Sequence, residues 1–478
     1  MQTIIKNIEN LFIKTFQCSI LSTKILPASG SNRRYFRISY QGGSIIGVFN
    51  DDRKENEAFL SFTKHFLRQG IAVPKILAED IANNIYLLSD LGDETLFVCL
   101  TTERAKYPNE SFPEKLKYYY QAALKGLLEI QFCGKNGLDF SKCYPRSAFD
   151  AQSIRWDLNY FKYYFLKLAK IPFDEQLLED DFDTLSSFLL EADSQYFLYR
   201  DFQSRNLMIF NNEIYFIDYQ GGRMGALQYD VASLLYDGKA NIPDDIREEL
   251  LSYYIQQLRT THPQQAEHFR KYYYAFVFIR IMQAMGSYGF RGFYEGKKHF
   301  LRSIPYALKN LSWLLEHVKL GIDIPHLWMV FHRIIQSPFL QQFCVPKLLV
   351  QINSFSYKDV QPTDRSGNGG GFVFDCRCLP NPGRYEQYKC LNGCDKQVVD
   401  FLDNSLEVAL YFDHVKSIVD MAVKNYIHRQ FSNLMISFGC TGGQHRSVYF
   451  ANKLSQYLQN TYDIDIEISH LMQEKWIK

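Results

Sequence analysis

Three side chains that carry oxygen donors, at fixed spacing, have the clearest chemical use in this sequence. Asp201 and Asn206 lie five residues apart in one stretch, and Asp218 ends the next apolar segment. Phosphoryl transfer needs a carboxylate that accepts the proton of the attacking hydroxyl, and oxygen ligands that hold Mg²⁺ against the phosphates. We therefore predict that Asp201 is the general base and that Asn206 and Asp218 are the metal ligands.

The alternative is that Asp201 and Asn206 are ordinary loop residues, because Asp and Asn are common in turns. A D-x-x-x-x-N pair alone is a weak signal. Here the pair lies between two β-type segments, 196–199 and 214–218, which interrupt a region of helical periodicity. A β-rich segment precedes that region. The combination is much rarer than the pair, so it favours the catalytic interpretation.

The elements that must position these residues have the order of a small kinase-like N-lobe followed by a helical C-lobe. Short β-type runs cover residues 35–40, 44–49 and 84–89, and a helix is predicted over residues 55–69. The glycines at 42 and 43 predict a hairpin turn between the first two runs. We place the N-lobe at about residues 1–95 and the C-lobe at about residues 96–336.

This region resembles the aminoglycoside phosphotransferase superfamily, and within it the anomeric kinases of N-acetylmuramate and N-acetylglucosamine. The resemblance covers about the first two-thirds of the chain and rests on SGSNRRYFR from Ser29, LLSDLGD from Leu87, RDFQSRNLM from Arg200 and YDVASLL from Tyr229. It implies an α+β, protein-kinase-like bilobal fold. It also implies ATP-dependent phosphorylation of a small hydroxylated substrate, with an amino sugar as the expected acceptor and the anomeric hydroxyl as a candidate position.

The resemblance further implies ATP and Mg²⁺ as cofactors and assigns roles to individual residues. Asp230 would be a structural acid that braces the catalytic loop. The cofactor-binding residues would be the loop over the phosphates and the hinge that meets adenine, namely Ser29, Gly30, Ser31, Asn32 and Arg33, then Ser89, Asp90 and Leu91.

Two departures from the family pattern matter. Tyr199 occupies the position where a loop histidine is common. We expect the loop to keep its conformation, because Tyr can still pack and donate a hydrogen bond. The strand at residues 45–49 carries no lysine to hold the α- and β-phosphates. Arg33, Arg34 and Lys54 are the candidates for that role, and Glu57 is interpreted as part of a solvated helix face. The missing lysine also motivates an alternative, a degenerate kinase fold in a non-catalytic sensor or RNA-regulatory adapter.

The final region has the pattern of a small α/β domain, which we place at residues 348–478. Strand-like segments at 348–352, 372–375 and 434–438 alternate with a helical middle and a helix from about His445. A glycine-rich turn covers residues 366–371. The boundary with the kinase-like domain (1–336) is expected within residues 337–347, which Pro338 and Pro346 bracket.

The sequence SFGCTGGQHRS, from Ser437, predicts a phosphate-binding loop in this domain. An apolar strand feeds a glycine-bearing loop that opens a helix, where backbone N–H groups and Arg446 would attract an anion. The spacing from Cys440 to Arg446 and Ser447 also fits a phosphatase loop with Cys440 as the thiolate nucleophile. We prefer binding without cleavage and keep the phosphatase as the alternative.

The same region, about residues 348–470, resembles the C-terminal domain of the RNase adapter protein RapZ. The matching strings are VFDCRCLPNP from Val373 and GCTGGQHRSVY from Gly439. The resemblance implies a site for a phosphosugar like glucosamine-6-phosphate, and RNA or protein partners. The chain's end is less basic than the family's, which argues against RNA contact. The implied phosphosugar-binding residues are Asp375, Arg377, Cys440, Thr441, Gly442, Gly443, His445 and Arg446.

Cys376, Cys378, Cys390 and Cys394 also raise the question of a zinc site. Strand periodicity would put Asp375 and Arg377 on one face and the first two cysteines on the other, so we interpret those cysteines as small core residues. For His445, the alternative to ligand binding is a local hydrogen bond within its loop.

The composition restricts the classes of protein and of partner that fit this sequence. The 478 residues are 46% hydrophobic and 22% charged, which predicts folded domains, and the net charge of +1 gives no bulk attraction to nucleic acid or anionic membranes. No apolar run approaches the ~20 residues that span a bilayer. The N-terminus lacks a secretory signal pattern, and the ten cysteines are scattered. We expect a soluble cytoplasmic protein.

Overall fold

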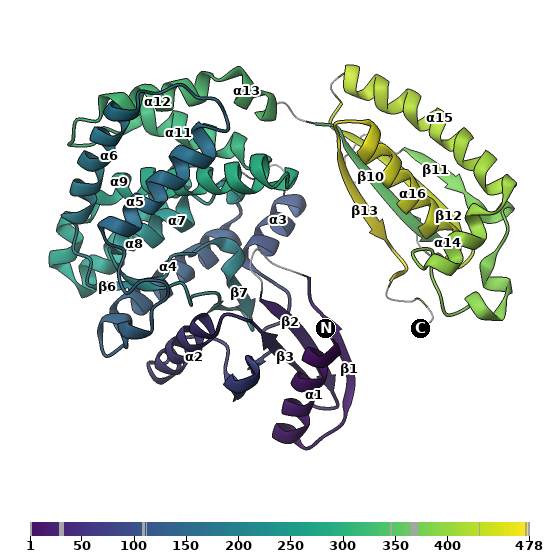
Figure 1. Cartoon of the computed structure of the whole chain (residues 1–478), viewed down its shortest axis with the longest axis horizontal. Helices are drawn as coiled ribbons and strands as arrows, with labels where there is room; N and C mark the ends of the chain where they lie inside the picture. The colour runs from purple at the N-terminus through teal and green to yellow at the C-terminus, as the bar shows by residue number, and fades with distance from the viewer. Residues whose placement is uncertain are drawn as a thin grey trace. The chain divides into compact units, whose positions relative to one another are not determined.

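The computed structural model describes residues 2–27, 33–107, 110, 112–344, 347–359, 361–364, 371–429, 431–473 and 476. The chain divides into two compact units, Met1–Cys344 and Val345–Lys478, which are treated separately below (Figure 1). The predicted phosphate-loop residues Ser29, Gly30, Ser31 and Asn32, and residues 366–370 of the glycine-rich turn, lie outside the described residues. Within the described residues, no helix has the length and apolarity needed to cross a membrane.

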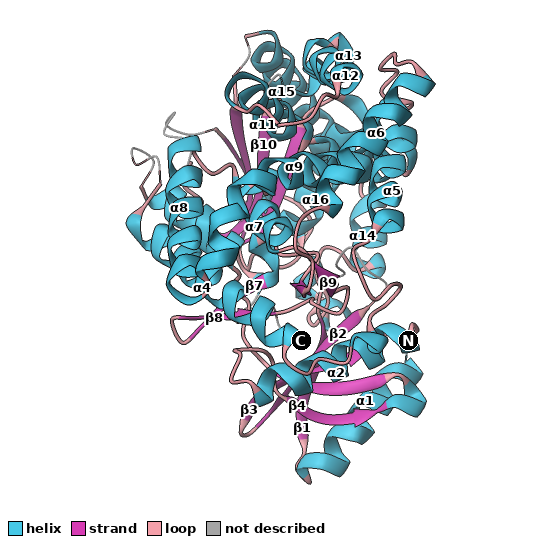
Figure 2. Cartoon of the chain, turned by 90° about the vertical axis from the view of Figure 1, so that its left-hand side faces the viewer, coloured by secondary structure: helices cyan, strands magenta, loops and turns pink. Residues whose placement is uncertain are grey.

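The first unit begins with an antiparallel sheet of order β1-β2-β3-β5-β4, which lies with α1 and α2 in the lower part of Figure 2. The predicted strands and helix are confirmed as β2, β3, β5 and α2, whereas α1, β1 and β4 were not predicted. The elements are α1 (Gln2–Phe16), β1 (Ile20–Ile25), β2 (Arg34–Tyr40), β3 (Gly43–Phe49), α2 (Arg53–Arg68), β4 (Ile76–Asp80) and β5 (Ile85–Ser89).

Alternation along the strands gives this sheet two buried faces. Phe36, Ile38 and Ile45 pack with Phe12 of α1, while Val48 joins the larger core that includes α2. Gly47 marks the closest approach of α1, because a Cβ atom at this position would lie 2.4 Å from Cγ2 of Ile8. The sheet is therefore clamped between α1 on one face and the core shared with the C-lobe on the other.

The rest of the first unit is a helical lobe with two short two-stranded sheets. β6 pairs with β9, and β7 pairs with β8, so the β-type segments predicted near residues 196–199 and 214–218 are confirmed. The strands are β6 (Tyr196–Leu198), β7 (Leu207–Phe210), β8 (Glu213–Phe216) and β9 (Arg223–Gly225). The helices are α3 (Leu96–Lys106), α4 (Glu114–Lys135), α5 (Ala151–Tyr160), α6 (Glu175–Leu190), α7 (Leu227–Leu235), α8 (Asp244–Thr261), α9 (Pro263–Tyr288), α10 (Lys298–Leu301), α11 (Ile304–His317), α12 (Pro325–Gln336) and α13 (Pro338–Gln341).

The second unit is an α/β domain with a parallel sheet of order β11-β12-β10-β13 (Figure 1). The three predicted strand segments are confirmed as parts of β10, β11 and β12. Because the strands are parallel, Ser356, Asp375 and Cys440 meet at one edge of the sheet, where their strands end. The elements are β10 (Leu349–Ser356), β11 (Phe372–Asp375), α14 (Lys396–Asp403), α15 (Leu406–His428), β12 (Asn433–Cys440), α16 (Arg446–Thr461) and β13 (Asp465–His470).

Candidate functional site

The first unit brings Asp201, Asn206 and Asp218 together. The amide Nδ2 of Asn206 donates to the backbone carbonyl of Asp201 at 2.8 Å and lies 3.4 Å from Oδ2 of Asp218. The backbone N–H of Ile217, the residue before Asp218, donates to the carbonyl of Asn206. This bond joins the end of the strand that leads to Asp218 to the loop of Asp201 and Asn206. Asp201 is exposed, whereas Asn206 is buried. The Asp201 carboxylate is therefore accessible to a small molecule, whereas Asn206 is held inside the loop.

Asp230 holds the backbone of the loop that carries Asp201. The fully buried carboxylate of Asp230 accepts hydrogen bonds from the backbone N–H groups of Tyr199, at 2.7 Å, and Arg200, at 3.0 Å. Burial raises the pKa of Asp230 to about 7, although the two N–H donors act in the opposite direction. The hydroxyl of Tyr199 donates to the carbonyl of Ile217. The expected bracing role of Asp230 and the expected hydrogen bond of Tyr199 are both present.

Arg200 adds a second brace, which sequence reasoning missed. Its guanidinium donates two hydrogen bonds to Asp157 of α5, at 2.8 and 2.6 Å, and lies over the rings of Phe149 and Tyr229. The backbone of Arg200 has φ of 81°, a left-handed conformation that non-glycine residues rarely adopt. The bidentate pair and the Asp230 hydrogen bonds together hold the chain in this turn immediately before Asp201.

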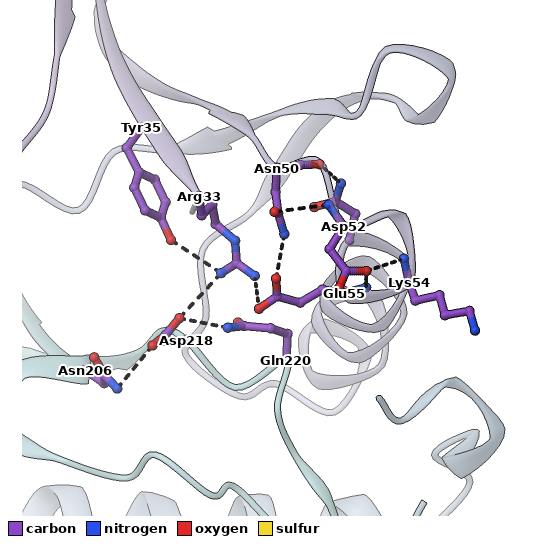
Figure 3. Close-up of polar contacts among 10 residues, drawn as sticks. Arg33, Tyr35, Asn50, Asp52, Lys54, Glu55, Asn206, Asp218 and Gln220 are labelled. Atoms are coloured by element: carbon purple, nitrogen blue, oxygen red, sulfur yellow. Dashed lines mark hydrogen bonds and ion pairs between the residues drawn. The ribbon is translucent and has the colours of Figure 1, made fainter. Parts of the chain in front are cut away.

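Arg33 supplies a buried cation where β3 offers no lysine (Figure 3). It is 2% exposed. Its Nη2 lies 2.9 Å from Oε1 of Glu55 in α2, and its Nη1 lies 3.4 Å from both Oδ1 of Asp218 and the hydroxyl of Tyr35. Burial acts to lower the pKa of Arg33, but neighbouring Tyr86, Tyr35, Glu55 and Asp218 raise it above its ordinary value. Arg33 therefore stays charged and connects a helix acid to the predicted metal ligand.

The helix acid in this bridge is Glu55, which sequence reasoning did not single out. Glu55 also accepts a hydrogen bond from Nδ2 of Asn50 at 2.6 Å, while the N-cap Asp52 accepts from the first-turn N–H groups. The D-x-x-E spacing of Asp52 and Glu55 resembles an ordinary capping box, so it carried no functional signal. Glu57 pairs with Arg53 on the outer surface, so its interpretation as part of a solvated face is confirmed.

The predicted hinge follows β5, and its acidic side chain is occupied within the fold. Arg37 donates to both carboxylate oxygens of Asp90, at 2.6 and 3.1 Å, and to the carbonyl of Gly92. Ser44 also donates to Asp90. Leu91 is buried, and Ser89 exchanges hydrogen bonds with Lys75. Only the backbone of this segment is therefore suited to contact a base, with the Asp90 carboxylate serving as its brace.

The donor set around Asp218 fits a magnesium ion. Partial burial and the nearby Asp201 raise the pKa of Asp218, while Arg33 and Gln220 oppose the rise. With Nδ2 of Asn206 used as a donor, its Oδ1 is the atom suited to a metal. Mg²⁺ usually takes one or two carboxylates and completes its shell with phosphates and water. No group of three His, Cys, Asp or Glu side chains placed to hold a metal occurs among the described residues.

In the second unit, the predicted phosphosugar residues meet at the carboxyl edge of the sheet. Thr441 and Gly442 are exposed at the top of the loop, and Gly443 has φ of 67°, whereas Gly442 is not in the left-handed region. The helix α16 starts at Arg446 without a side-chain cap. Uncapped first-turn N–H groups beside an exposed loop are suited to bind an anion.

Arg446 does not point outward as an anion-binding residue would. It is 4% exposed, and its Nη1 donates to the carbonyls of Arg377 and Leu379 at 2.9 Å each. Its buried Nε has no partner among the described residues. These bonds make Arg446 a brace that joins the loop to the end of β11, and its Nε is the donor left for the predicted anion contact.

The other predicted residues of this loop also have internal partners. The thiol of Cys440 is 2% exposed, lies 3.1 Å from the hydroxyl of Ser447 and accepts from the N–H of Gly443 at 3.2 Å. His445 hydrogen-bonds the carbonyl of Tyr388 at 2.8 Å, which is the local role considered as its alternative, and burial lowers its pKa. A buried thiol is poorly placed for attack, so the geometry favours binding over thiolate catalysis.

Asp375 and Arg377 form an ion pair at the mouth of the loop. Arg377 donates to Asp375 at 2.6 Å, and its guanidinium lies 4.0 Å from the ring centre of Tyr357. The chain leaves the strand at Asp375 and enters a 3₁₀ turn, residues 376–378. Strand alternation therefore fails here: Cys376 is buried as expected, but Cys378 is exposed, which corrects its assignment to the core.

Comparison with known proteins agrees with this division. The phosphotransferase enzyme family (APH) model matches residues 22–269, more than half of the chain, so the chain belongs to this family. Residues 348–474 match the RapZ C-terminal domain.

Among curated relatives, a nucleotide-binding protein from Thermosipho africanus is 39% identical over 25% of this chain and 42% of its own length. One from Agathobacter rectalis is 30% identical over 37% and 59%. The chain thus spans less than two-thirds of the length of either relative.

Solved structures with a similar fold include a choline kinase from Cryptosporidium parvum Iowa II. It is 15% identical with a TM-score of 0.46, over 68% of this chain and 98% of that one. The choline kinase LicA from Streptococcus pneumoniae is 15% identical with a TM-score of 0.42, over 64% and 99%.

The Asp230 brace makes a testable prediction. In Asp230→Asn, an amide NH₂ faces a backbone N–H, and the lost hydrogen bond should lower the free energy of unfolding by about 1–3 kcal/mol. Because the pKa of Asp230 rises from 3.8 to about 7 on folding, the protonated carboxyl stabilises the wild type below pH 3.8. That stabilisation is lost as the pH rises through 7. Denaturation at pH 5.5 and pH 8 should therefore show a larger deficit at pH 5.5.

The matched control for this prediction is Asp51→Asn, at an exposed position. It should unfold like the wild type at both pH values. An Asp230→Asn protein as stable as the control would contradict the bracing role.

Proposed function

We propose that this protein transfers a phosphoryl group from ATP to a hydroxyl of an amino sugar, with the anomeric hydroxyl as the candidate position. The observation that carries the proposal is the convergence of Asp201, Asn206 and Asp218 on a loop that Asp230 and Arg200 hold rigidly. Family membership supports the reaction class, and the amino-sugar acceptor rests on the similarity of the motifs. The intact bracing of the loop argues against a degenerate site.

In this proposal, the exposed Asp201 carboxylate orients the acceptor hydroxyl and takes its proton as the new P–O bond forms. The bond between the γ-phosphorus and the β,γ-bridging oxygen breaks in the same step, and ADP leaves. Oδ1 of Asn206 and the carboxylate of Asp218 would hold Mg²⁺, which neutralises charge on the phosphates. Asp230 and Arg200 keep Asp201 fixed on one side of the loop, and the Asn206 amide bond to the Asp201 carbonyl fixes the spacing to the metal ligands.

A product-identified assay tests this function. Purified protein with Mg-ATP should phosphorylate at least one of N-acetylglucosamine, N-acetylmuramate and glucosamine. Asp201→Asn should lower kcat by about 100-fold or more, because general-base catalysis contributes about 10²–10⁴. KM for ATP should change little. Asp193→Asn, on the turn before β6, serves as a matched control. Unchanged kcat in Asp201→Asn would exclude the assigned role, and no product with any acceptor would exclude the function.

We further propose that Arg33 holds the ATP phosphates in place of a strand lysine. Its two ends are held unequally, since the contact with Glu55 is 2.9 Å and those with Asp218 and Tyr35 are 3.4 Å. The Nη1 end is therefore the one that can turn to a phosphate oxygen while Glu55 keeps the guanidinium in place. Arg34 and Lys54 are exposed and do not share this position.

Nucleotide binding distinguishes Arg33 from the other candidates. Arg33→Met should weaken ADP binding by about 10- to 100-fold, the effect of losing a hydrogen bond to a charged group, and should leave adenosine binding near the wild-type value. Arg34→Met and Lys54→Met are the matched controls, and calorimetry is the measurement. If Arg33→Met does not fold because Glu55 loses its partner, Arg33→Met/Glu55→Gln removes both charges. Equal losses for ADP and adenosine would contradict the proposal.

For the second unit, we propose binding of an amino-sugar phosphate such as glucosamine-6-phosphate. The exposed loop of Thr441 and Gly442, the uncapped start of α16 and the buried Nε of Arg446 support this proposal. The Asp375–Arg377 pair at the loop mouth offers polar groups for the sugar. The buried thiol of Cys440 makes the phosphatase alternative the weaker one.

Calorimetric titration of the full chain with glucosamine-6-phosphate checks this site. Gly442→Val should abolish or strongly weaken binding, because the added side chain fills the exposed top of the loop without meeting any atom of the fold within 4 Å of its Cβ. Gly321→Val, at another open position, is the matched control and should bind like the wild type. No heat of binding in the wild type, or equal affinity in Gly442→Val, would overturn the assignment.

A further inference from the structure

Arg280 of α9 carries a buried positive charge that lacks an acidic partner. The residue is 7% exposed. Its Nε donates to the hydroxyl of Ser233 in α7 at 3.0 Å, and its Nη1 donates to the side-chain oxygen of Gln283, about one turn further along α9. Both partners are neutral, and Arg280 forms no ion pair with any residue that the structure describes.

Two other arginines of the first unit are buried as deeply as Arg280 and have a carboxylate partner. Arg33 pairs with Glu55, and Arg247 pairs with Asp244. Such a pair offsets the cost of withdrawing a guanidinium from water, whereas a buried charge without a counter-charge destabilises the fold. The charge of Arg280 is therefore one that a bound anion can offset.

Arg280 and Gln283 also leave N–H donors unused. A guanidinium can only donate, so the Gln283 atom that faces it is the carbonyl oxygen, and the amide NH₂ is the other branch. Neither that NH₂ nor Nη2 of Arg280 has a hydrogen-bond partner among the described residues, and neither is sealed from solvent. Two free donors beside a positive charge suit a group that only accepts hydrogen bonds, namely a carboxylate or a phosphate.

These donors lie at the start of a partly open face of α9. Gln283, Ala284, Ser287 and Tyr288 are half-buried, and they follow Arg280 by three, four, seven and eight residues, which places them on one side of the helix. The residues between them are buried. A small molecule can therefore approach α9 along this face, where three of the four half-buried side chains are polar.

This face of α9 is connected to the catalytic loop through the end of α7. Ser233, the partner of Arg280, precedes Asp237 by about one helical turn. Asp237 accepts hydrogen bonds from the hydroxyl of Ser204 at 2.7 Å and from its backbone N–H at 3.3 Å. Ser204 lies three residues after Asp201. One turn of α7 thus links the buried guanidinium to the loop of the proposed base.

Two further contacts place the same face of α9 beside this loop. The hydroxyl of Tyr288 lies 3.3 Å from the place where a Cβ atom on Gly238 would be. The ring of Phe276, one turn before the buried arginine, lies 6.5 Å from the ring of Tyr229, and the guanidinium of Arg200 lies over that same Tyr229 ring. All these residues belong to the C-lobe, whereas the predicted nucleotide contacts belong to the N-lobe. The position therefore suits the acceptor and not ATP.

We propose that Arg280 and Gln283 form a subsite for an anionic group of the acceptor, a carboxylate or a phosphate. The proposal rests on the proposed phosphotransferase function and deepens it, because it gives the charge of the preferred acceptor. Nη2 of Arg280 and the NH₂ of Gln283 donate to the anion, and this contact holds the acceptor with its hydroxyl toward Asp201. The protein should therefore use acceptors that carry such a group better than neutral ones.

Two matched acceptor pairs measure this preference. N-acetylmuramate and N-acetylglucosamine differ by a carboxylate-bearing substituent, and glucosamine-6-phosphate and glucosamine differ by a phosphate. In the wild type, kcat/KM should favour the anionic member of at least one pair, and the pair that shows the preference identifies carboxylate or phosphate. A wild type that uses the neutral members as well as the anionic ones would overturn the subsite and leave the phosphotransferase function intact.

Gln283→Glu separates anion binding from a structural role of Arg280. The new carboxylate keeps the contact with Arg280, so the variant should fold, but it offsets the charge and removes the second donor. The anionic-to-neutral ratio of kcat/KM should fall by about 10- to 100-fold, the effect of lost hydrogen bonds to a charged group. Gln264→Glu, at an exposed position of α9, is the matched control and should keep the wild-type ratio. An unchanged ratio in Gln283→Glu would mean that the contact is structural only.

Arg280→Met is the second variant and decides the question if Gln283→Glu does not fold. It removes the charge and should lower the same ratio by a similar factor. Arg270→Met is its matched control, because Arg270 lies on an exposed part of the same helix and pairs with Glu248. A folded Arg280→Met protein with the wild-type ratio would contradict the subsite.

If the wild type phosphorylates none of the four sugars, the proposed function fails, and binding tests the subsite separately. The second unit is another candidate site for anions, so all four sugars are titrated by calorimetry in a Gly442→Val background. The anionic member of one pair should bind more tightly than the neutral member, and Gln283→Glu should remove the difference. Equal affinities within both pairs, no binding of any sugar, or a difference that survives Gln283→Glu would overturn the subsite.

Discussion

The conformation of the loop that carries Asp201 depends on the two backbone hydrogen bonds that the buried carboxylate of Asp230 accepts. Two consecutive backbone N–H groups can point to one carboxylate only if the chain turns sharply, and Arg200 accordingly takes a left-handed conformation. A non-glycine residue adopts that conformation only where its surroundings impose it. The bidentate Arg200–Asp157 pair supplies the rest of the restraint, and the turn places Asp201 at the surface with Asn206 buried behind it.

Arg33 places a buried cation beside Asp218 although β3 carries no lysine. A buried guanidinium is costly unless it is paired, and Glu55 and Asp218 supply the partners from two lobes. Arginine suits this position because its planar guanidinium presents several N–H donors to separate acceptors at once. A lysine ammonium is a compact point charge at the end of a flexible chain. The missing strand lysine thus does not imply a missing cation. It moves the cation from β3 to the residue before β2 and makes Glu55 its helix partner.

The grouping of Asp201, Asn206 and Asp218 could be predicted because its signal is local: Asn206 lies five residues after Asp201, and an apolar strand leads to Asp218. The interactions that position these residues could not be predicted, because their partners are distant in sequence and look like surface charges. Asp218 and Arg33, Arg200 and Asp157, and Arg37 and Asp90 meet only after folding. Likewise, strand periodicity placed Cys376 correctly and failed at Cys378, where a 3₁₀ turn ends the alternation.

On the proposed function, the second unit has to distinguish one sugar phosphate from another. A loop that binds phosphate through backbone N–H groups responds to the phosphate itself and not to the carbon that bears it. On the proposed function, the first unit makes an amino-sugar phosphate and the second binds one, so discrimination between positional isomers must come from groups that touch the sugar. Arg446 is committed to backbone carbonyls, and Cys440 is buried. On the same proposal, the Asp375–Arg377 pair beside this loop offers the side chains that would distinguish one sugar phosphate from another.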